Sequence, residues 1–310
     1  MQIRVTAGVV VYFPDWPLLE QLIRVLVASA DKVLIFANSA LSSAEREQVL
    51  NLAESSRIEI LQSNQNVGLG RAYNHLIARA RSLEANAIFL CDQDSGPSAE
   101  TIRSLVHNAY QLSAKGQRVA VVGPRPISPR LRGAEFKSVH LFKRGRHGHS
   151  ARVVAADFVI SSGSLILLDA FDKVGLFRED FFIDGIDIEW CFRAWSKGYS
   201  CWIVLDALME HRLGRGMLTV PFTGFSVPIQ PPYRLYTYVR NQIHMLGFNH
   251  VPLRWKIKVV PYIVLQALVY ALKGRHRRMS LAAFWRGVRD GTRLMRRDLG
   301  IGGALDRMRG

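Results

Sequence analysis

This sequence has few cysteines and no recognisable signal peptide. Its 310 residues include three cysteines, Cys91, Cys191 and Cys201, and none of them forms a CxxC pair. This spacing argues against a disulfide framework and against a zinc knuckle, and it suits a reducing, cytoplasmic setting. The opening segment, MQIRVTAGVVVYF, lacks the charged region, apolar region and cleavage site of a signal peptide, so we expect no secretion.

The sequence also lacks an apolar run of bilayer length. The longest such run, residues 259–272, has about fourteen residues, with Gln266 inside it and a proline near its start. A helix that spans a membrane needs about 20 apolar residues. We therefore predict an interfacial or docked helix, and the cations that follow it suit a membrane surface.

Acidic residues are few relative to basic ones. Lys and Arg number 41 against 25 Asp and Glu, a net charge of +16. Residues 251–310 hold fourteen Lys or Arg and three Asp, a net of +11, whereas residues 1–250 hold 27 basic and 22 acidic residues, a net of +5. Such a tail suits an anionic membrane or nucleic acid. Without a helix-turn-helix, zinc or RNA-binding signature we favour the membrane and expect no nucleic acid. The alternative is an amphipathic helical pair folded back on the rest of the chain.

Short β-rich runs alternate with amphipathic helical patterns in the first half of the chain. We predict strands over residues 3–12, 32–37, 57–61, 87–91 and 118–122, with helices between them. This order gives βαβ units and an α/β fold with a parallel sheet. Ligands bind such sheets beyond the carboxyl ends of the strands, so the polar residues after each strand are the candidate site.

The second half of the chain is less regular. Residues 124–150 are rich in Pro, Gly, Arg and His, which predicts loops or a hairpin. We expect a strand over residues 152–160, the turn SSGS, a short helix near 169–174, and then a helix that leads into a strand within 181–204. Beyond about residue 233 the pattern is helical, aromatic and basic.

Two acids, Asp92 and Asp94, end the fourth predicted strand in the run IFLCDQDS. Two carboxylates one residue apart at a sheet edge can share Mg²⁺ or Mn²⁺, because these ions take oxygen ligands and offset the repulsion between the acids. The alternative is a pair of solvated turn acids, with Asp94 or Ser95 capping the next helix. The position after the fourth strand favours the metal.

The segment NQNVGLGRAYN follows the third predicted strand. Asn66 is placed to cap a helix that begins near Gly68, and the glycines let the backbone approach a phosphate or a base. A nicotinamide-binding fingerprint would need a third glycine where Tyr73 stands, and it would follow the first strand. A dinucleotide oxidoreductase is therefore disfavoured, while an ordinary helix start remains the alternative.

The segment FFIDGIDIEWCFRA places Asp184, Asp187 and Glu189 among large apolar residues. Buried acids lower stability unless they are paired or functional. A capping arrangement of Asp184 and Asp187 would explain two of them, but it leaves Glu189 beside Trp190 without an explanation. A carboxylate at a helix start beside aromatic groups is suited to accept a proton from a hydroxyl.

Taken together, these segments resemble a known family. The turn at residues 12–14, Asn38, NVGLGRAYN, LCDQDS, SSGSLIL, VGLFREDFFIDGIDIEWCFRAWSKGY and EHRLG are similar to the inverting family 2 glycosyltransferases. Within that family, FFIDGIDIEWCFRA and YRLYTYVRNQI are most similar to bacterial rhamnosyltransferases that use dTDP-L-rhamnose. The resemblance covers about residues 5–300 and implies a GT-A fold, Rossmann-like with a mostly parallel central sheet, and a C-terminal helical, basic extension.

The resemblance also assigns roles to residues. By the resemblance, Asp94 is the principal ligand of Mg²⁺ or Mn²⁺, and Asp92 contacts the ribose or the metal. His211 completes the coordination, although a lone histidine would not by itself indicate a metal ligand. Asp187 stands at the position of the general base. Many relatives have an acidic residue directly before that base. This chain has Ile186 at that position, and the rhamnosyl-type members also lack the acid.

The remaining expected contacts divide between the nucleotide-sugar donor and the acceptor. The acceptor is expected to meet Trp190, Asp184 and Glu189. The donor is expected to meet Tyr12, Phe13, Pro14, Asn38, Asn66, Gly68, Asp92 and Gln93.

We therefore expect an inverting glycosyltransferase that moves L-rhamnose from dTDP-L-rhamnose to a lipid-linked or polysaccharide acceptor in O-antigen or exopolysaccharide synthesis. The alternatives are another hexose from a UDP- or GDP-sugar, rhamnolipid-type transfer to a lipid, and a basic membrane or nucleic-acid adaptor without catalysis. We expect a catalytic domain over residues 1–235, with a nucleotide-binding half (1–95) and an acceptor half (96–235). Residues 236–310 would be helical and would hold the enzyme, alone or as a homodimer, on the inner face of the bacterial cytoplasmic membrane.

Overall fold

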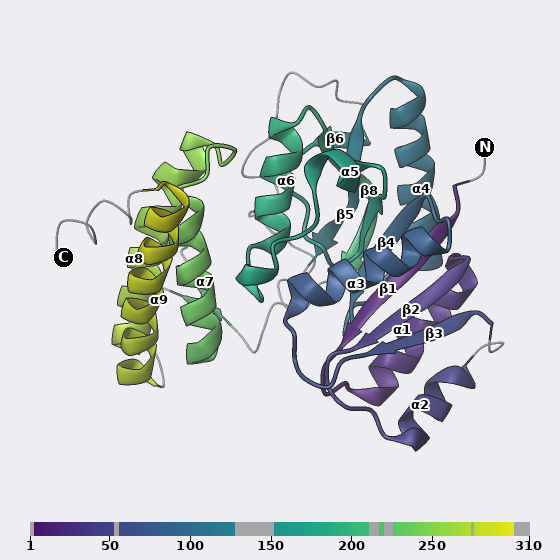
Figure 1. Ribbon diagram of the computed structural model, residues 1–310, viewed down its shortest axis with the longest axis horizontal. Coiled ribbons are helices and arrows are strands. Elements are labelled where there is room, and N and C mark those ends of the chain that lie inside the picture. Colours follow the sequence, from purple (N-terminus) through teal and green to yellow (C-terminus); the bar gives the residue numbers. More distant parts are fainter. Residues whose placement is uncertain are drawn as a thin grey trace. The chain divides into compact units, whose positions relative to one another are not determined.

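The computed structural model of the protein describes residues 3–52, 56–127, 152–210, 217–219, 226–273 and 276–300. The chain divides into two compact units (Figure 1). Unit 1 comprises Met1–Asp180 and Trp190–Arg212, and unit 2 comprises Phe181–Glu189 and Leu213–Gly310.

Unit 1 is built on an eight-stranded sheet with the order β3-β2-β1-β4-β7-β5-β8-β6. Strands β3, β2, β1 and β4 are parallel, β7 is antiparallel to both β4 and β5, β8 is parallel to β5, and β6 is antiparallel to β8. The strands are β1 (Val5–Val11), β2 (Lys32–Ala37), β3 (Ile58–Gln62), β4 (Ala87–Asp92), β5 (Val119–Ile127), β6 (Val153–Ala155), β7 (Ser164–Leu167) and β8 (Ser200–Glu210).

The central strands are buried along nearly their whole length. All seven residues of β1 are buried, as are the last five of β2 and the first five of β4. Strands of a parallel sheet are covered on both faces, which is why their sequences are continuous apolar runs rather than alternating ones. The α/β fold with a mostly parallel sheet is confirmed.

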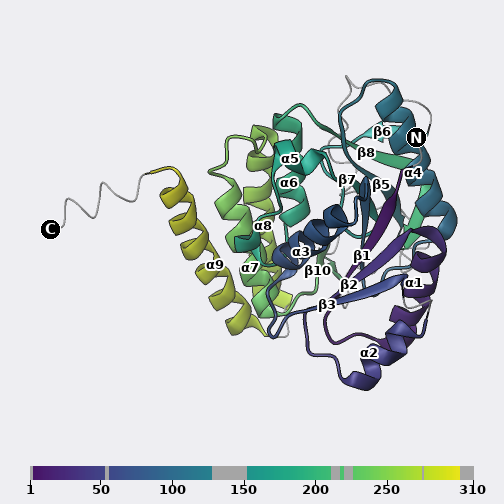
Figure 2. The same ribbon diagram turned by 45° about the vertical axis from the view of Figure 1, so that its right-hand side comes forward.

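Helices cover both faces of this sheet (Figures 1 and 2). One core cluster joins apolar side chains of α1 and α4 to the sheet, and α3 contacts β1 and β2 from the other face. Asp15 caps α1 by accepting a hydrogen bond from the Leu18 N–H, as N-cap acids commonly do. The helices of this unit are α1 (Trp16–Ser29), α2 (Ser43–Leu50), α3 (Leu69–Ser82), α4 (Ala99–Ala114) and α5 (Ala170–Val174), and α6 (Ile186–Ser196) continues into it.

Strand β5 is longer than the sequence predicts. It was expected to end at Val122, but it continues to Ile127 through Pro124 and Pro126. Within β5, only Val121 and Val122 pair with β7. The last part of β5 therefore pairs with β8 alone, across a register shift at Pro124. Proline is tolerated where a strand has a bulge and one neighbour. The predicted strand at 152–160 is shorter, as β6, and the predicted loops beyond residue 127 lie outside the described residues.

Unit 2 is helical where the sequence predicts helices. It contains α7 (Pro232–Met245), α8 (Leu253–Lys273), α9 (Arg277–Asp298) and a two-stranded sheet of β9 (Met217–Thr219) and β10 (Ser226–Pro228). The boundary expected at residue 235 falls inside α7. Its core contains Leu235, Val239, Val259, Ile263 and Phe284.

Glycines let α9 lie close against α7. A Cβ at Gly287 would come within 2.9 Å of the Tyr236 carbonyl oxygen, and one at Gly291 within 2.5 Å of the Arg240 carbonyl oxygen. Both contacts are with backbone, which cannot move aside as a flexible side chain can. The two glycines therefore set the distance between the helices.

This packing predicts that Gly291→Ala destabilises unit 2 by about 1–3 kcal/mol, because overpacking forces the helices apart. Urea unfolding followed by circular dichroism measures the change. Gly96→Ala is the control, since a Cβ at Gly96 meets nothing within 4 Å. Equal midpoints for the two variants would contradict the interpretation.

Candidate active site

The carboxyl ends of β1, β2 and β4 meet at one edge of the sheet. Val11 is paired with Ala37, and Val10 with Asp92, so the residues that follow these strands are neighbours. The Gln93 side chain bridges two of the ends, because its Oε1 accepts the Tyr12 N–H at 2.7 Å and its Nε2 donates to the Tyr12 carbonyl at 3.1 Å. The middle residue of the Asp92-Gln93-Asp94 motif thus ties that motif to the turn after β1.

Two aromatic rings are exposed at this edge. Tyr12 is 46% exposed and Phe13 is 75% exposed, and their rings meet edge to face at 4.7 Å. Phe13 adopts a left-handed backbone conformation (φ 45°), and its N–H donates to Ser39 Oγ at 3.1 Å. Pro14 follows, directly before the cap of α1. Solvated aromatic faces of this kind are suited to stack against a flat base.

The buried Asn38 and the exposed Asn66 form a pair that holds the start of α3. Asn38 Oδ1 accepts the Val67 N–H at 2.8 Å, and Asn38 Nδ2 donates to Asn66 Oδ1 at 2.9 Å. The same oxygen accepts the Gly68 N–H at 2.9 Å. Asn66 does not cap the helix as the sequence suggested. The N-cap is Gly68, whose φ of 81° favours glycine, and no side chain caps this end.

The rest of the NVGLGRAYN segment contacts residues 177–179 of the same unit. A Cβ at Gly70 would lie 2.5 Å from the Arg178 carbonyl oxygen, so glycine allows this close approach. Asn74 donates to the Phe177 carbonyl at 3.0 Å and to Glu179 Oε1 at 3.1 Å, and it accepts the Phe177 N–H at 3.0 Å. The segment thereby fixes residues 177–179 within unit 1.

Asp92 and Asp94 differ in their surroundings. Asp92 is half-buried, with its N–H donating to Ser162 Oγ at 3.0 Å and the Tyr73 hydroxyl 3.4 Å from its Oδ1. Asp94 is exposed. Neither Asp94 nor Ser95 caps the following helix, because Ser98 does so by accepting the Thr101 N–H at 3.0 Å. The capping alternative for Asp94 is therefore wrong.

The Asp92 and Asp94 pair fits a hard divalent cation by its chemistry. Mg²⁺ and Mn²⁺ prefer oxygen ligands, and Mg²⁺ is usually held by one or two carboxylates plus waters and substrate phosphates. The third expected ligand, His211, lies outside the described residues. Within the part of the chain that the structure describes, no group of three or more His, Cys, Asp or Glu could hold a metal by itself.

Asp184 belongs to a loop, residues 181–185, that α7 holds in place. The loop has positive φ at Phe182 (62°), Asp184 (66°) and Gly185 (82°). The Asp184 carboxylate accepts hydrogen bonds from the Arg234 guanidinium and, at 3.3 Å, from the Thr237 hydroxyl. A left-handed backbone is unfavourable for non-glycine residues and persists where its surroundings over-determine it.

Asn241 supplies most of the backbone contacts of this loop. Its Nδ2 donates to the carbonyl oxygens of Phe181 at 2.9 Å, Ile183 at 2.9 Å and Asp184 at 2.8 Å. The neighbouring Arg240 also donates to the Phe181 carbonyl at 2.9 Å. Asn241 is 1% exposed. The segment YRLYTYVRNQI therefore contains the residues that position the acid loop.

Asp187 and Glu189 lie in the first turn of α6 but in different environments. Asp187 is half-buried, and its Oδ1 accepts the Ile188 N–H at 2.9 Å. Glu189 is 1% exposed, and its Oε1 lies 2.8 Å from Nε2 of His250.

Trp190 and two of the cysteines are core residues of unit 1. The Trp190 ring is 1% exposed and packs against Phe171 and Phe177, and its indole N–H donates to the Gly175 carbonyl at 2.8 Å. Contact with an acceptor would require this cluster to open. Cys91 and Cys191 are buried, and burial followed by the charge of Asp92 raises the pKa of the Cys91 thiol far above its ordinary range.

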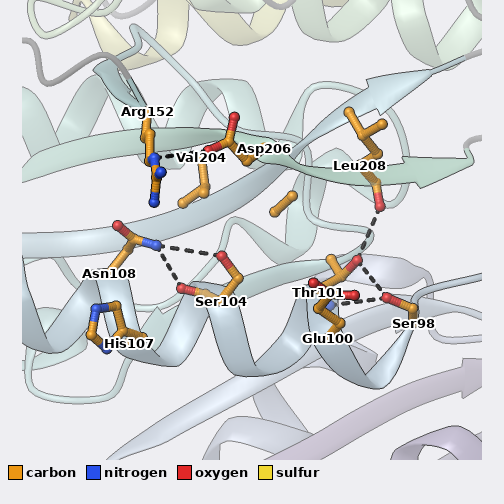
Figure 3. Close-up of a pocket in the computed structure, with 11 residues that line it drawn as sticks. Ser98, Glu100, Thr101, Ser104, His107, Asn108, Arg152, Val204, Asp206 and Leu208 are labelled. Carbon is orange, nitrogen blue, oxygen red and sulfur yellow. Dashed lines mark hydrogen bonds and ion pairs between the residues drawn. The ribbon is translucent and has the colours of Figure 1, made fainter.

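A separate cavity of about 680 Å³ lies between α4 and β8 (Figure 3). Thr101 reaches across it to donate to the Leu208 carbonyl at 3.0 Å, while His107, Asn108 and Arg152 line its other end. Its lining includes none of the residues that the sequence analysis selected.

The comparisons with known proteins define the class to which this site belongs. Residues 8–175 match the model of Glycosyl transferase family 2, and the chain belongs to that family. It is therefore a glycosyltransferase. It is 28% identical over 267 residues to the "dTDP-rhamnosyl transferase RfbF" of Shigella flexneri, over 84% of this chain and 86% of that protein.

Solved structures share the fold at low sequence identity. The mannosyltransferase PcManGT from Pyrobaculum calidifontis, in complex with GDP-Man and Mn²⁺, has a TM-score of 0.53 at 11% identity, over 98% of this chain and 81% of that one. TarS 1–349 from S. aureus, in complex with UDP-GlcNAc, has a TM-score of 0.54 at 12% identity, over 92% and 82%. GalNAc-T7 with UDP, GalNAc and Mn²⁺ has a TM-score of 0.54 at 12% identity, over 89% of this chain but 58% of its own length. These neighbours confirm the GT-A fold.

We predict that Asn241→Ala destabilises the protein by about 2–4 kcal/mol, because three hydrogen bonds to the backbone carbonyls of the loop are lost. Urea unfolding measures the loss. Asn108→Ala is the matched control, since the Asn108 amide donates to the Ser104 carbonyl within its own helix. A loss no larger than that of the control would contradict the role of Asn241.

The lowered pKa of Glu179 predicts that the stability of the protein depends on pH. The hydrogen bond from Asn74, and then Arg71, lower the pKa of Glu179 from its ordinary value of 4.5. A carboxyl group with a lowered pKa in the folded state stabilises the protein above about pH 4.5, and this contribution is lost as the pH falls through the folded-state pKa.

Glu179→Gln should therefore lower the melting temperature near neutral pH, and the difference from the wild type should shrink as the pH falls below 4.5. Differential scanning fluorimetry across this range measures it. The exposed Glu47 of α2 provides the control variant, Glu47→Gln. A difference that stays constant with pH would rule out the ionised pair as its cause.

Proposed function

We propose that this glycosyltransferase moves L-rhamnose from dTDP-L-rhamnose to a hydroxyl of a lipid-linked or polysaccharide acceptor in surface-glycan synthesis. The observation that carries this proposal is the 28% identity to a dTDP-rhamnosyl transferase across most of both chains. The family match supports glycosyl transfer in general. The similarity of FFIDGIDIEWCFRA and YRLYTYVRNQI to rhamnosyltransferases supports the same sugar.

The carboxyl edge of the sheet is proposed to bind the nucleotide end of the donor. The exposed rings of Tyr12 and Phe13 offer faces for the base. Gln93 holds the backbone of Tyr12 beside the two acids, so base contacts and diphosphate contacts are linked through one side chain. Asp94 and Asp92 would hold Mg²⁺ or Mn²⁺, which when bound offsets the charge of the diphosphate.

Asp187 is proposed to accept the proton of the acceptor hydroxyl. In the same loop and helix turn, Asp184 is engaged by Arg234, and Glu189 lies beside His250. Asp187 is the half-buried acid at the helix start, where the helix dipole favours a carboxylate. As the proton passes to Asp187, the acceptor oxygen bonds to the anomeric carbon and the bond to the diphosphate breaks. The configuration at that carbon inverts.

A donor screen tests the proposal. We expect dTDP-L-rhamnose with Mn²⁺ to raise the melting temperature and to be hydrolysed or transferred, and UDP-glucose, UDP-galactose and GDP-mannose to do less. Asp187→Asn should lower kcat by about 10²- to 10⁴-fold, because one general base is lost, while the thermal shift remains. Asp94→Asn should remove the part of the thermal shift that depends on metal.

Asp206→Asn serves as the control, because this exposed carboxylate of β8 lies in the separate cavity. Preference for a UDP- or GDP-sugar would overturn the choice of rhamnose but not the family. Full activity of Asp187→Asn would overturn its role as the base.

A further inference from the structure

Helix α8 has an exposed apolar stripe along its whole length. Seven large aliphatic side chains on it are between 36% and 70% exposed. Six of them follow one another at intervals of three or four residues, which places them on one face of a helix with 3.6 residues per turn. The seven are Leu253, Ile257, Val260, Val264, Leu265, Leu268 and Leu272.

The opposite side of α8 is already packed. Val259, Ile263 and Tyr270 are buried in the cluster that also contains Val239 of α7 and Phe284 of α9. Packing within unit 2 therefore explains one side of the helix but not the exposed one. A contiguous exposed apolar surface on a folded protein commonly marks an interaction site.

Cationic side chains lie at both ends of the stripe. Arg254, Lys256 and Lys258 occupy the first turns of α8, and Arg277 and Arg278 begin α9. Residues 251–310 hold fourteen Lys or Arg and three Asp, a net of +11. Apolar side chains bordered by cations match a surface of acyl chains beneath anionic headgroups. Two copies of this face would instead bring like charges together.

The same observations favour a helix that lies in the interface. Within the part of the chain that the structure describes, Leu253–Leu272 is the one helical segment with the length and composition to cross a membrane. However, crossing would remove Tyr270 from its core and would place Gln266, which is 1% exposed, among acyl chains. It would also carry Lys256 and Lys258 toward the bilayer. Such groups are unfavourable in hydrocarbon.

We propose that unit 2 docks on an anionic membrane through the exposed stripe of α8, with the helix parallel to the membrane plane. The proposal does not depend on which sugar or acceptor the enzyme uses. It names the bilayer itself as the partner and the stripe as the surface that enters it.

Vesicle flotation tests the proposal with the full chain. Wild-type protein should float with phosphatidylglycerol–phosphatidylcholine vesicles, and the bound fraction should fall in high salt. In Val264→Ser/Leu268→Ser it should fall by roughly tenfold or more, because apolar surface is removed from the interface. Tyr110→Ser/Leu176→Ser changes two exposed apolar residues of unit 1 and should float like the wild type.

Fluorescence reports the contact without removing it. Because Cys91, Cys191 and Cys201 are all buried, a cysteine at Leu268→Cys can be labelled selectively with an environment-sensitive dye. The dye should shift to the blue and brighten when anionic vesicles are added. The same dye at Tyr110→Cys should not change. No change at residue 268 would overturn the proposal even if a stripe variant failed to fold.

Two further outcomes would also overturn it. If light scattering showed that the stripe variant only converts a dimer to a monomer, the stripe would bind a second copy. If alkaline carbonate failed to release the protein from membranes, α8 would cross them. Donor hydrolysis should be unchanged in the stripe variant, so a wrong proposal here is distinguishable from a wrong choice of sugar.

Discussion

Side-chain amides hold the backbone where regular pairing ends. Residues that leave a strand or a helix still carry N–H and C=O groups that need partners. Gln93, Asn38 and Asn74 supply these partners in unit 1, and Asn241 does so in unit 2. An amide is neutral and both donates and accepts hydrogen bonds. It can therefore fix a loop beside carboxylates without neutralising their charge.

Three acids close together in sequence acquire different properties from their partners. Asp184 faces the guanidinium of Arg234 and ties its loop to α7. Glu189 is enclosed beside His250. Asp187 stays half-buried at the start of a helix. Acids that are close in sequence thus lie in different surroundings, and such differences are how proteins commonly divide the roles of neighbouring carboxylates.

Much of the fold could be predicted because its signals are local. The first four strands are continuous buried runs, and the helices between them have amphipathic patterns, so periodicity alone locates them within a few residues. The extension of β5 could not be predicted, because Pro124 and Pro126 are typical of a strand end unless the single neighbour of that segment is known. Nor could the partner of Asp184 be found from spacing, since Arg234 is fifty residues away. Asn66 was placed correctly at the start of α3, but the cap there is Gly68, whose backbone conformation the sequence does not reveal.

Helix α7 contacts both the loop at residues 181–185 and helix α9, and Arg240 takes part in both contacts. Its guanidinium donates to the Phe181 carbonyl in the acid loop, and its own carbonyl faces Gly291 of α9. The C-terminal helices therefore support the loop that contains Asp184. A shortened protein that ends before α9 would therefore lack one of the two surfaces that hold α7, the helix on which the loop depends.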